Sequence, residues 1–271
     1  MSTTSAVHWL IQANQRDALA VSGTCEALDD MGTPWHLVTL QPFAPEIPPV
    51  PALPAGVPVV CYGPGFVPRT LNHPHLRPGI FFDDAAFRWS AFQTHWAELM
   101  LSQDGRVLPL GEALEVLARL APGERRFVRP DEDSKAFDGG LHDHASLAAA
   151  TAKARVTPAT PVVLASPTPV DAEWRTFVVG GEVVAASEYR REGRPSTQGY
   201  VPDAVIDLAL ESVRRWAPAS AVCVDMARSG ERYGVVEANC INAARFYAAN
   251  GRRILQALTE HAAALCGPYE M

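Results

Sequence analysis

Seven prolines between Pro42 and Pro58 restrict how the N-terminal part of this chain can fold. Proline lacks a backbone N–H and fixes φ, so a segment this rich in proline cannot form a helix or a central strand. We therefore predict a surface connection between two elements. The alternative is a partner-binding polyproline segment, which the irregular spacing of the prolines disfavours.

The hydrophobic pattern on both sides of the proline segment predicts a parallel sheet. Residues 6–13 and 34–40 have the composition of strands, and residues 16–32 between them have helical periodicity and end at a glycine. A third short strand is predicted at 59–63. A strand, a helix and a second strand in this order form a β-α-β unit, so the chain begins as an α/β fold.

The remainder of the chain has patterns of helices and antiparallel strands. Two hairpins are predicted, at 173–190 and 221–240, each with glycine in its turn. Single strands are predicted at 125–130 and 161–167, and helices at 83–101, 143–154, 203–217 and 244–265. These elements add an α+β part to the α/β opening.

Composition and charge exclude several classes of protein. The sequence has 23 Lys and Arg against 30 Asp and Glu, a formal charge of −7, which disfavours binding to nucleic acid. Its five cysteines are scattered and include no C-x-x-C pair, as in reduced cytosolic proteins. The N-terminus lacks a basic start, and no window reaches the roughly 18 to 20 apolar residues of a membrane span. We expect a cytoplasmic protein with no membrane or nucleic-acid partner.

An acidic strand near the C-terminus provides the first candidate site. In the stretch YGVVEANCIN, residues 233–242, Glu237 and Asn239 are two positions apart and point to the same face of a strand. A carboxylate is hardly ever buried unless it is paired or coordinates a metal. Asp225 lies on the preceding strand, and two carboxylates with an amide oxygen suit Mg²⁺. The alternative is a solvated edge of the sheet.

The turn of this hairpin decides whether the metal site can exist. A two-residue loop at Ser229 and Gly230 would put Asp225 and Glu237 on opposite faces. A three-residue loop from Ser229 to Glu231, or a bulge in either strand, would bring them to one face. We therefore predict an odd loop or a bulge.

The first hairpin carries an arginine inside an apolar strand. If Val179 pairs with Glu182 across Gly180 and Gly181, Arg175 lies opposite Ala186 and Glu173 opposite Glu188. One face then carries Asp171, Glu173, Arg175, Glu182, Glu188 and Arg190, and the other carries Trp174, Thr176, Val178, Val183, Ala185 and Tyr189. The alternative is a solvated face with surface ion pairs.

A third candidate site follows the strand at 125–130. Arg129 ends this strand, and Lys135 and the pair Gly139 and Gly140 follow in a short loop. Cations and backbone N–H groups of a glycine loop can neutralise the oxygens of a polyphosphate. The loop is not a Walker A motif, because no G-x-x-x-x-G-K-[ST] precedes a helix. The alternative is an exposed polar loop.

In order along the chain, these features resemble the ATP-grasp superfamily, and especially its small clade named for two arginines and one lysine. They are a strand ending in a cation, a glycine loop, a hinge-like strand, an arginine-bearing hairpin and a final D…E-x-N hairpin. The resemblance implies an ATP-grasp fold, α/β with α+β parts, with an N-terminal Rossmann-like β-α-β domain at 1–82. A central subdomain at 83–165 and a C-terminal subdomain with the metal site at 166–271 would follow.

The resemblance also implies a role for each candidate residue. Arg129 stands where many ATP-grasp proteins have lysine, so it departs from the wider family. Arg129 and Lys135 would hold ATP phosphates, Leu164, Ala165 and Ser166 would meet adenine through their backbone, Asp171 or Glu173 would bind the ribose, Arg175 would stabilise the transferred phosphate and Arg190 would join the nucleotide contacts. Asp225, Glu237 and Asn239 would hold Mg²⁺, and Asn242 and Arg245 would contact the acceptor or the acyl phosphate.

The activity implied by the resemblance is ATP-dependent ligation of a small-molecule or peptide carboxylate to an amine or a thiol. The carboxylate would become an acyl phosphate, with ADP and then phosphate released. Two alternatives remain open, a small-molecule kinase that uses the same ATP and Mg²⁺ site, and a nucleotide-binding regulatory module without turnover. The sequence identifies neither substrate and does not set the oligomeric state.

Overall fold

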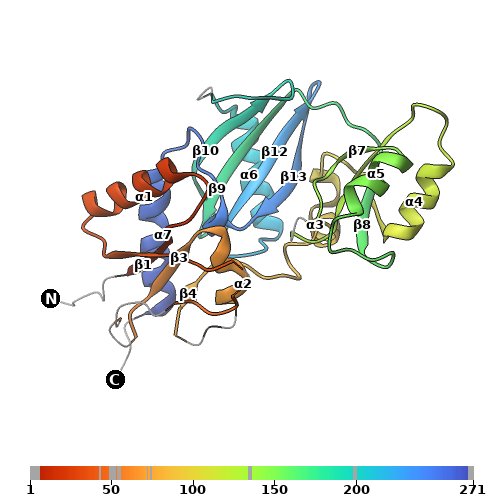
Figure 1. Ribbon diagram of the computed structural model, residues 1–271. Helices are drawn as coiled ribbons and strands as arrows, with labels where there is room; N and C mark the ends of the chain where they lie inside the picture. The colour runs from red at the N-terminus through yellow and green to blue at the C-terminus, as the bar shows by residue number, and fades with distance from the viewer. Residues whose placement is uncertain are drawn as a thin grey trace.

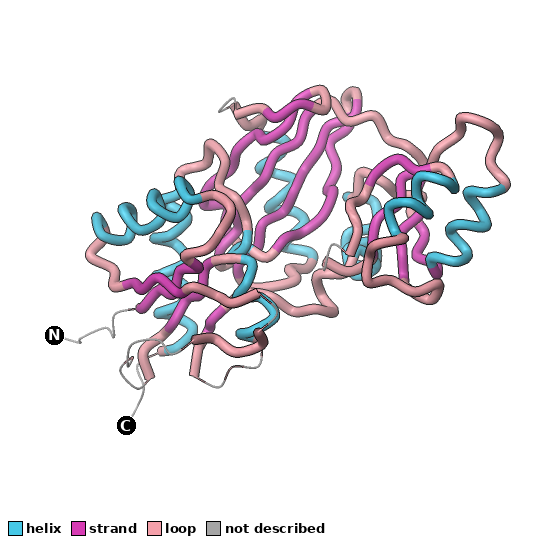
Figure 2. Tube along the Cα trace, in the orientation of Figure 1, coloured by secondary structure: helices cyan, strands magenta, loops and turns pink. Residues whose placement is uncertain are grey.

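The protein contains three β-sheets, as the computed structural model shows (Figure 1). We name them the N-terminal, central and C-terminal sheets by their order in the sequence. The structure describes residues 7–42, 44–48, 53, 56–71, 73, 75–133, 136–197 and 200–267. Figure 2 shows the strands as three groups, with helices packed against each group. The mixed α/β fold class predicted from the sequence is confirmed.

The N-terminal sheet is parallel, with strand order β2-β1-β3-β4. Helix α1 connects β1 to β2, and the Asp17 side chain caps it by accepting a hydrogen bond from the Ala20 backbone N–H. The predicted β-α-β unit is therefore present. The elements are β1 (His8–Gln12), α1 (Ala18–Asp30), β2 (Trp35–Val38), β3 (Val59–Tyr62) and β4 (Pro78–Gly79).

The proline segment connects β2 to β3. Its described residues, 42, 44–48, 53 and 56–58, contain no helix or strand, as the sequence predicts. The remaining residues of the segment lie outside the described part of the chain. After β3 the chain forms two short helical turns, η1 (Pro64–Phe66) and α2 (Val67–Thr70).

The C-terminal sheet is antiparallel, with strand order β11-β10-β9-β12-β13. Helices α3 and α6 cover one face, where Trp96 and Trp174 belong to a common buried cluster. Helix α7 and the N-terminal sheet cover part of the other face, where Phe177 packs with Trp9 and Leu255. The elements are α3 (Trp89–Trp96), β9 (Ala172–Val179), β10 (Glu182–Arg191), β11 (Arg194–Pro195), α6 (Asp203–Arg215), β12 (Ala221–Ser229), β13 (Arg232–Asn239), η3 (Ile241–Ala243) and α7 (Gly251–Cys266).

The central sheet has its own core, separate from that of the two other sheets. Leu108, Val128, Leu147 and Val162 are buried together between the sheet, with order β5-β8-β6-β7, and helices α4 and α5. The elements are η2 (Ala97–Leu99), β5 (Arg106–Pro109), α4 (Leu110–Ala118), β6 (Arg126–Pro130), β7 (Gly140–His142), α5 (His144–Thr151) and β8 (Pro161–Ala165). Within the described residues, no helix combines the length and the apolar character that crossing a membrane requires.

The helix predicted at 244–265 begins later than expected. Asn250 caps α7, since its side chain accepts a hydrogen bond from the Arg253 backbone N–H at 3.0 Å. Residues 244–250 instead form a loop that follows the C-terminal sheet. The prediction was wrong here because apolar periodicity outweighed the Asn-Gly pair at 250–251, which marks a helix start.

Gly234 allows the segment before the central sheet to lie directly on β13. A Cβ atom at Gly234 would lie 2.6 Å from the Leu101 Cα, and the Leu101 N–H bonds to the Val235 carbonyl at 2.8 Å. We expect Gly234→Ala to lower the free energy of unfolding by about 1–3 kcal/mol, because backbone must move to admit the methyl group. Urea unfolding measures this loss.

Gly23 in α1 provides the control, since no atom lies within 4 Å of a Cβ built there. Gly23→Ala should stabilise the protein by about 0.5–1 kcal/mol, because glycine costs conformational entropy inside a helix. Equal effects of the two substitutions would contradict the tight contact at Gly234.

Candidate functional site

A cleft of about 660 Å³ lies between the central and C-terminal sheets, and its size is that of a small-molecule site. Charged side chains of the C-terminal sheet line one wall, on the part of its face that α7 leaves uncovered. Its lining includes Phe127, Arg129, Val163, Ala165 and Ser166 on one side and Glu173, Arg175, Tyr189, Arg190, Asp225 and Glu237 on the other.

A bulge in the second hairpin brings its acidic residues together. A two-residue turn at Gly230 and Glu231 pairs Ser229 with Arg232, so regular pairing would place Asp225 opposite Val236. A register shift between Asp225 and Met226 instead pairs Asp225 with Glu237. The bulge predicted from the sequence is confirmed, although neither loop considered there is the one present.

The first hairpin departs from its predicted register. Val179 pairs with Glu182 as predicted, but two bulges in β10 place Ser187, not Ala186, opposite Arg175. Glu188 therefore pairs with Trp174 and lies on the other face. The predicted faces were wrong for Glu188, Ala185 and Tyr189, because each bulge reverses the alternation of side chains.

Buried Glu188 has its own partners on that opposite face. Its carboxylate forms an ion pair with Arg191 and accepts a hydrogen bond from the Ser196 hydroxyl at 2.5 Å. These contacts hold the chain that follows β10 against the sheet. Glu188 thus stabilises the fold away from the cleft.

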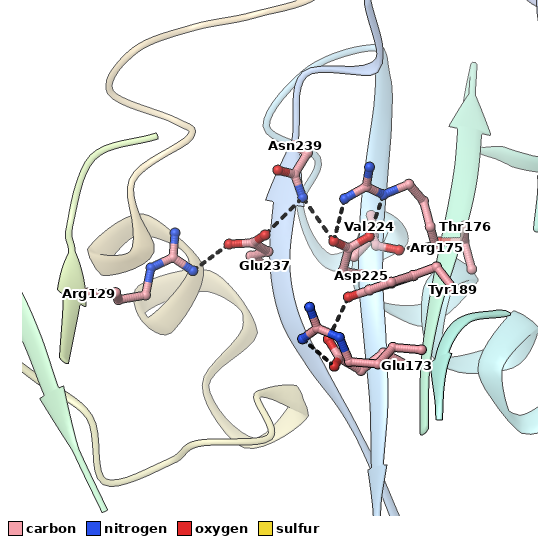
Figure 3. Close-up of polar contacts among 10 residues, drawn as sticks. Arg129, Glu173, Arg175, Thr176, Tyr189, Val224, Asp225, Glu237 and Asn239 are labelled. Carbon is pink, nitrogen blue, oxygen red and sulfur yellow. Dashed lines mark hydrogen bonds and ion pairs between the residues drawn. The ribbon is translucent and has the colours of Figure 1, made fainter. Parts of the chain in front are cut away.

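Arg175 and Asp225 form a buried ion pair in the cleft wall (Figure 3). The Arg175 Nε and Nη2 atoms donate to the two Asp225 carboxylate oxygens at 2.8 and 2.7 Å. Burial disfavours the charged guanidinium, but Asp225 outweighs it, so the pKa of Arg175 lies well above its ordinary value. Burial raises the pKa of Asp225, and Arg175 opposes that shift. The attraction between the two groups therefore offsets the cost of burying them.

A second ion pair crosses the cleft. Arg129, on β6 of the central sheet, donates to Glu237 on β13 at 2.5 Å, and the side chains are 14% and 19% exposed. Figure 3 shows Arg129 reaching toward the C-terminal sheet. This ion pair therefore connects the two sheets. It joins a candidate phosphate ligand, Arg129, to a candidate metal ligand, Glu237.

The donor set fits Mg²⁺ in kind. The Asn239 Nδ2 atom lies 3.1 Å from Asp225 Oδ2 and 3.2 Å from Glu237 Oε1, so the three side chains converge on one point. A half-turn of the amide would present Oδ1 there instead, and all donors would be hard oxygens. Among the described residues, no three His, Cys, Asp or Glu side chains form a metal cluster. Besides the two carboxylates, an ion here would need oxygens from Asn239, water and the substrate.

Glu173 organises the outer part of the cleft wall. It accepts hydrogen bonds from the Tyr189 hydroxyl at 2.6 Å and from Arg190 at 2.9 Å. The Arg190 guanidinium also lies over the Tyr189 ring, 6.0 Å from its centroid. Sequence reasoning placed Glu173 and Arg190 in the cleft but missed Tyr189.

Two further cavities continue from the cleft. The second, of about 690 Å³, shares Arg175 with the cleft and is also lined by Asn239, Arg245 and Tyr247. The third, of about 610 Å³, shares Arg245 and Tyr247 with the second. Arg175 thus stands at one boundary of the second cavity and Arg245 at the other.

Several residues assigned to the nucleotide have other surroundings. Leu164 is buried in the core of the central sheet, whereas Ala165 and Ser166 line the cleft. The Asp171 carboxylate accepts a hydrogen bond from the Gly230 N–H at 2.8 Å and so holds the turn of the second hairpin. Lys135 lies outside the described residues.

Asn242 has a structural place rather than the predicted place beside a substrate. Its side chain is fully buried, accepts a hydrogen bond from the Phe81 N–H and donates to the Cys61 carbonyl, both at 2.8 Å. These bonds connect η3, which follows β13, to the N-terminal part of the chain. Arg245, by contrast, is exposed and lines the second and third cavities.

Comparison with protein families gives one match over most of the chain. The model of the ATP-grasp domain, family 3 of the clade named for two arginines and one lysine, matches residues 73–258. No curated protein is significantly similar to the sequence.

Solved structures share the fold at low sequence identity. An ATP-grasp RimK domain protein from Sphaerobacter thermophilus DSM 20745 has a TM-score of 0.63 at 17% identity, over 94% of this chain and 99% of that one. D-alanine–D-alanine ligase from Bacillus anthracis has a TM-score of 0.60 at 11% identity, over 96% and 98%. The ATP-grasp ligase PsnB, complexed with minimal precursor, Mg and ADP, has a TM-score of 0.55 at 14% identity, over 97% and 98%.

Proposed function

Because the chain belongs to the ATP-grasp superfamily, in the clade named for two arginines and one lysine, we propose that it is an ATP-dependent ligase that joins a carboxylate to an amine or a thiol. The resemblance inferred from the sequence is confirmed by this membership. Similar structures include ligases, and one was solved with Mg and ADP. The observation that carries the proposal is the convergence of Asp225, Glu237 and Asn239 beside two arginines.

We assign the cleft to ATP. Ala165 and Ser166 would meet the adenine from β8, and Glu173 and Arg190 would meet the ribose from the opposite wall. Arg129 and Arg175 would neutralise the phosphates, with Lys135 as a further predicted phosphate ligand. Asp225, Glu237 and Asn239 would hold Mg²⁺, which when bound supplies positive charge to the phosphate oxygens.

The reaction needs no protein nucleophile. A substrate carboxylate oxygen attacks the γ-phosphorus, the bond to the β,γ-bridging oxygen breaks, and ADP leaves. An amine or thiol then attacks the acyl carbon, loses its proton and releases phosphate. Arg175 lies between the cleft and the second cavity, so it can stabilise charge on the group that passes between them.

We assign the second cavity to the substrates. Val67, Pro68, Leu71 and Phe82 contribute apolar surface to its lining. Arg175 and Arg245 contribute cations, and Asp84 and Asp133 contribute carboxylates. Such a cavity suits a molecule with an apolar body that carries a carboxylate or an amine. The volume of about 690 Å³ admits more than one amino acid, and the third cavity extends it beyond Arg245.

The proposal predicts that turnover requires two co-substrates. With hydroxylamine as the amine and a panel of carboxylates, we expect ADP, phosphate and hydroxamate in equal amounts. Glu237→Gln should lower this turnover by about 10² to 10³, the loss typical of removing one electrostatic contact to the transition state. Coupled ADP and phosphate assays with colorimetric detection of hydroxamate measure all three products.

The same assay separates the alternatives. A stable phosphorylated product and no hydroxamate would identify a kinase. Tight binding of ATP without ADP formation across the panel would favour a regulatory module. Glu115→Gln provides a control, because this exposed carboxylate pairs with Arg119 at the end of α4 and neither residue lines any of the three cavities.

A further inference from the structure

Two tyrosine rings lie against the guanidinium of Arg175. The Arg175 Cζ atom is 5.7 Å from the centroid of the Tyr189 ring and 5.5 Å from that of the Tyr247 ring. The two rings stack on each other, with centroids 5.1 Å apart and planes inclined by 18°. A guanidinium is attracted to the face of an aromatic ring within about 6 Å, and more strongly where water is excluded.

Tyr189 reaches Arg175 through the irregular strand β10. It lies at the register shift between Glu188 and Arg190, which brings its ring to the face of Arg175. The hydroxyl donates to Glu173 at 2.6 Å, so both ends of the side chain are held. Tyr189 thus connects the outer wall of the cleft to Arg175.

Tyr247 reaches the same place from the loop before α7, in an unusual backbone conformation. Its φ of 52° lies in the left-handed region, which side chains other than those of glycine, asparagine and aspartate seldom adopt. Hydrogen bonds of neighbouring residues hold this backbone conformation. The Tyr62 hydroxyl donates to the Ala244 carbonyl at 2.9 Å, and the Ala248 N–H donates to the Ser187 hydroxyl at 3.1 Å. Ser187 lies opposite Arg175 in the sheet. Strain retained in this way is common where function requires a fixed side chain.

A metal bound to Asp225 would weaken the hold of Asp225 on Arg175. Arg175 and Asn239 already use three of the roughly four lone-pair sites of the carboxylate, so a metal shares its charge and its oxygens with Arg175. The two ring centroids lie 5.7 and 5.5 Å from the guanidinium carbon, and these contacts use none of the Asp225 oxygens. They would therefore still hold it after Asp225 has turned to the metal.

We propose that Tyr189 and Tyr247 are positioning residues that aim Arg175 at the γ-phosphate. This inference rests on the proposed function, in which ATP occupies the cleft. It predicts discrimination between nucleotides, because a triphosphate meets Arg175 and a diphosphate does not reach it. Tyr247 is the better residue to test, since it is 41% exposed and lies outside the cleft lining.

The test compares the affinities of AMPPNP and ADP, each with Mg²⁺, by calorimetric titration. Tyr247→Leu should weaken AMPPNP about tenfold and ADP less than about twofold, as loss of a cation–π contact to a buried guanidinium predicts. Tyr247→Phe keeps the ring and should bind both nucleotides as the wild type does. Tyr200→Leu is the control, because the Tyr200 side chain is 73% exposed and lines none of the three cavities.

Tyr247→Gly keeps the test sound if the leucine variant folds poorly. Glycine adopts a positive φ without strain, so this variant loses the ring and keeps the backbone. It should show the same selective loss of AMPPNP affinity. Equal losses for ADP and AMPPNP, or a Phe variant as weak as the Gly variant, would overturn the inference. A wild-type protein that binds neither nucleotide would instead overturn the proposed function.

Discussion

Asp225→Asn should lower the free energy of unfolding by about 3–5 kcal/mol, because it leaves the Arg175 guanidinium buried without a negative partner. The Asp225 side chain is 2% exposed and that of Arg175 11%, so water cannot replace the lost carboxylate. Since asparagine has nearly the same shape and volume, the loss reports the charge and the hydrogen bonds of the carboxylate and not volume. Urea unfolding followed by circular dichroism measures it.

An exposed ion pair and a double replacement serve as controls for this loss. Asp30→Asn removes a pair whose side chains are 69% and 56% exposed, and should cost about 0–1 kcal/mol. Replacing both buried partners, in Arg175→Met with Asp225→Leu, should recover most of the stability, because no charge is then left unpaired. Losses of similar size at Asp225 and Asp30 would show that Arg175 finds other compensation.

The sequence predicted the elements better than the register between them. Glycine turns and apolar patterns located both hairpins, and the parallel opening followed from a strand, a helix and a strand in short succession. Two bulges in β10 escaped detection and reversed the faces of Glu188 and Tyr189. A bulge adds one residue without changing composition, so periodicity alone cannot locate it.

At the second hairpin, chemistry supplied what periodicity did not. Asp225, Glu237 and Asn239 can act together only on one face, and this requirement predicted an odd loop or a bulge. The same reasoning failed for Asn242, whose position after the strand suggested a substrate contact. Its amide bonds to the backbone of Phe81 and Cys61, which lie more than 150 residues away in sequence. Such partners follow from tertiary packing, which a local sequence motif does not reveal.

Tyr247 is a residue of the site that the sequence pattern likewise did not identify. Periodicity assigned it to a helix, whereas α7 begins only after its cap, Asn250, and Tyr247 lies in the preceding loop with a positive φ. Its contact with Arg175 joins residues that are far apart in sequence and has no local signature. Arg175, in contrast, was conspicuous because a charged residue inside an apolar strand requires a partner.

Binding of Mg²⁺ and of a triphosphate should be strongly coupled in this protein, by about 100-fold. Both candidate metal carboxylates already pair with arginines, Asp225 with Arg175 and Glu237 with Arg129. Mg²⁺ alone would draw the carboxylates from these arginines and leave them unpaired. A triphosphate alone would draw the arginines from the carboxylates. When both bind, the arginines pair with phosphate oxygens and the carboxylates bind the metal, so no charge is left unpaired.

Arg129→Gln distinguishes this exchange from the ordinary association of Mg²⁺ with ATP in solution. The substitution frees Glu237 from its cation, so Mg²⁺ without nucleotide should bind about tenfold more tightly than to the wild type, and the coupling should fall correspondingly. Arg126→Gln, on the same strand but in neither ion pair, is the matched control. Calorimetric titration of Mg²⁺, with and without AMPPNP, measures both quantities. If Arg129→Gln leaves the affinity for Mg²⁺ alone unchanged, Glu237 does not bind the metal, and the ion pair across the cleft serves only to connect the two sheets.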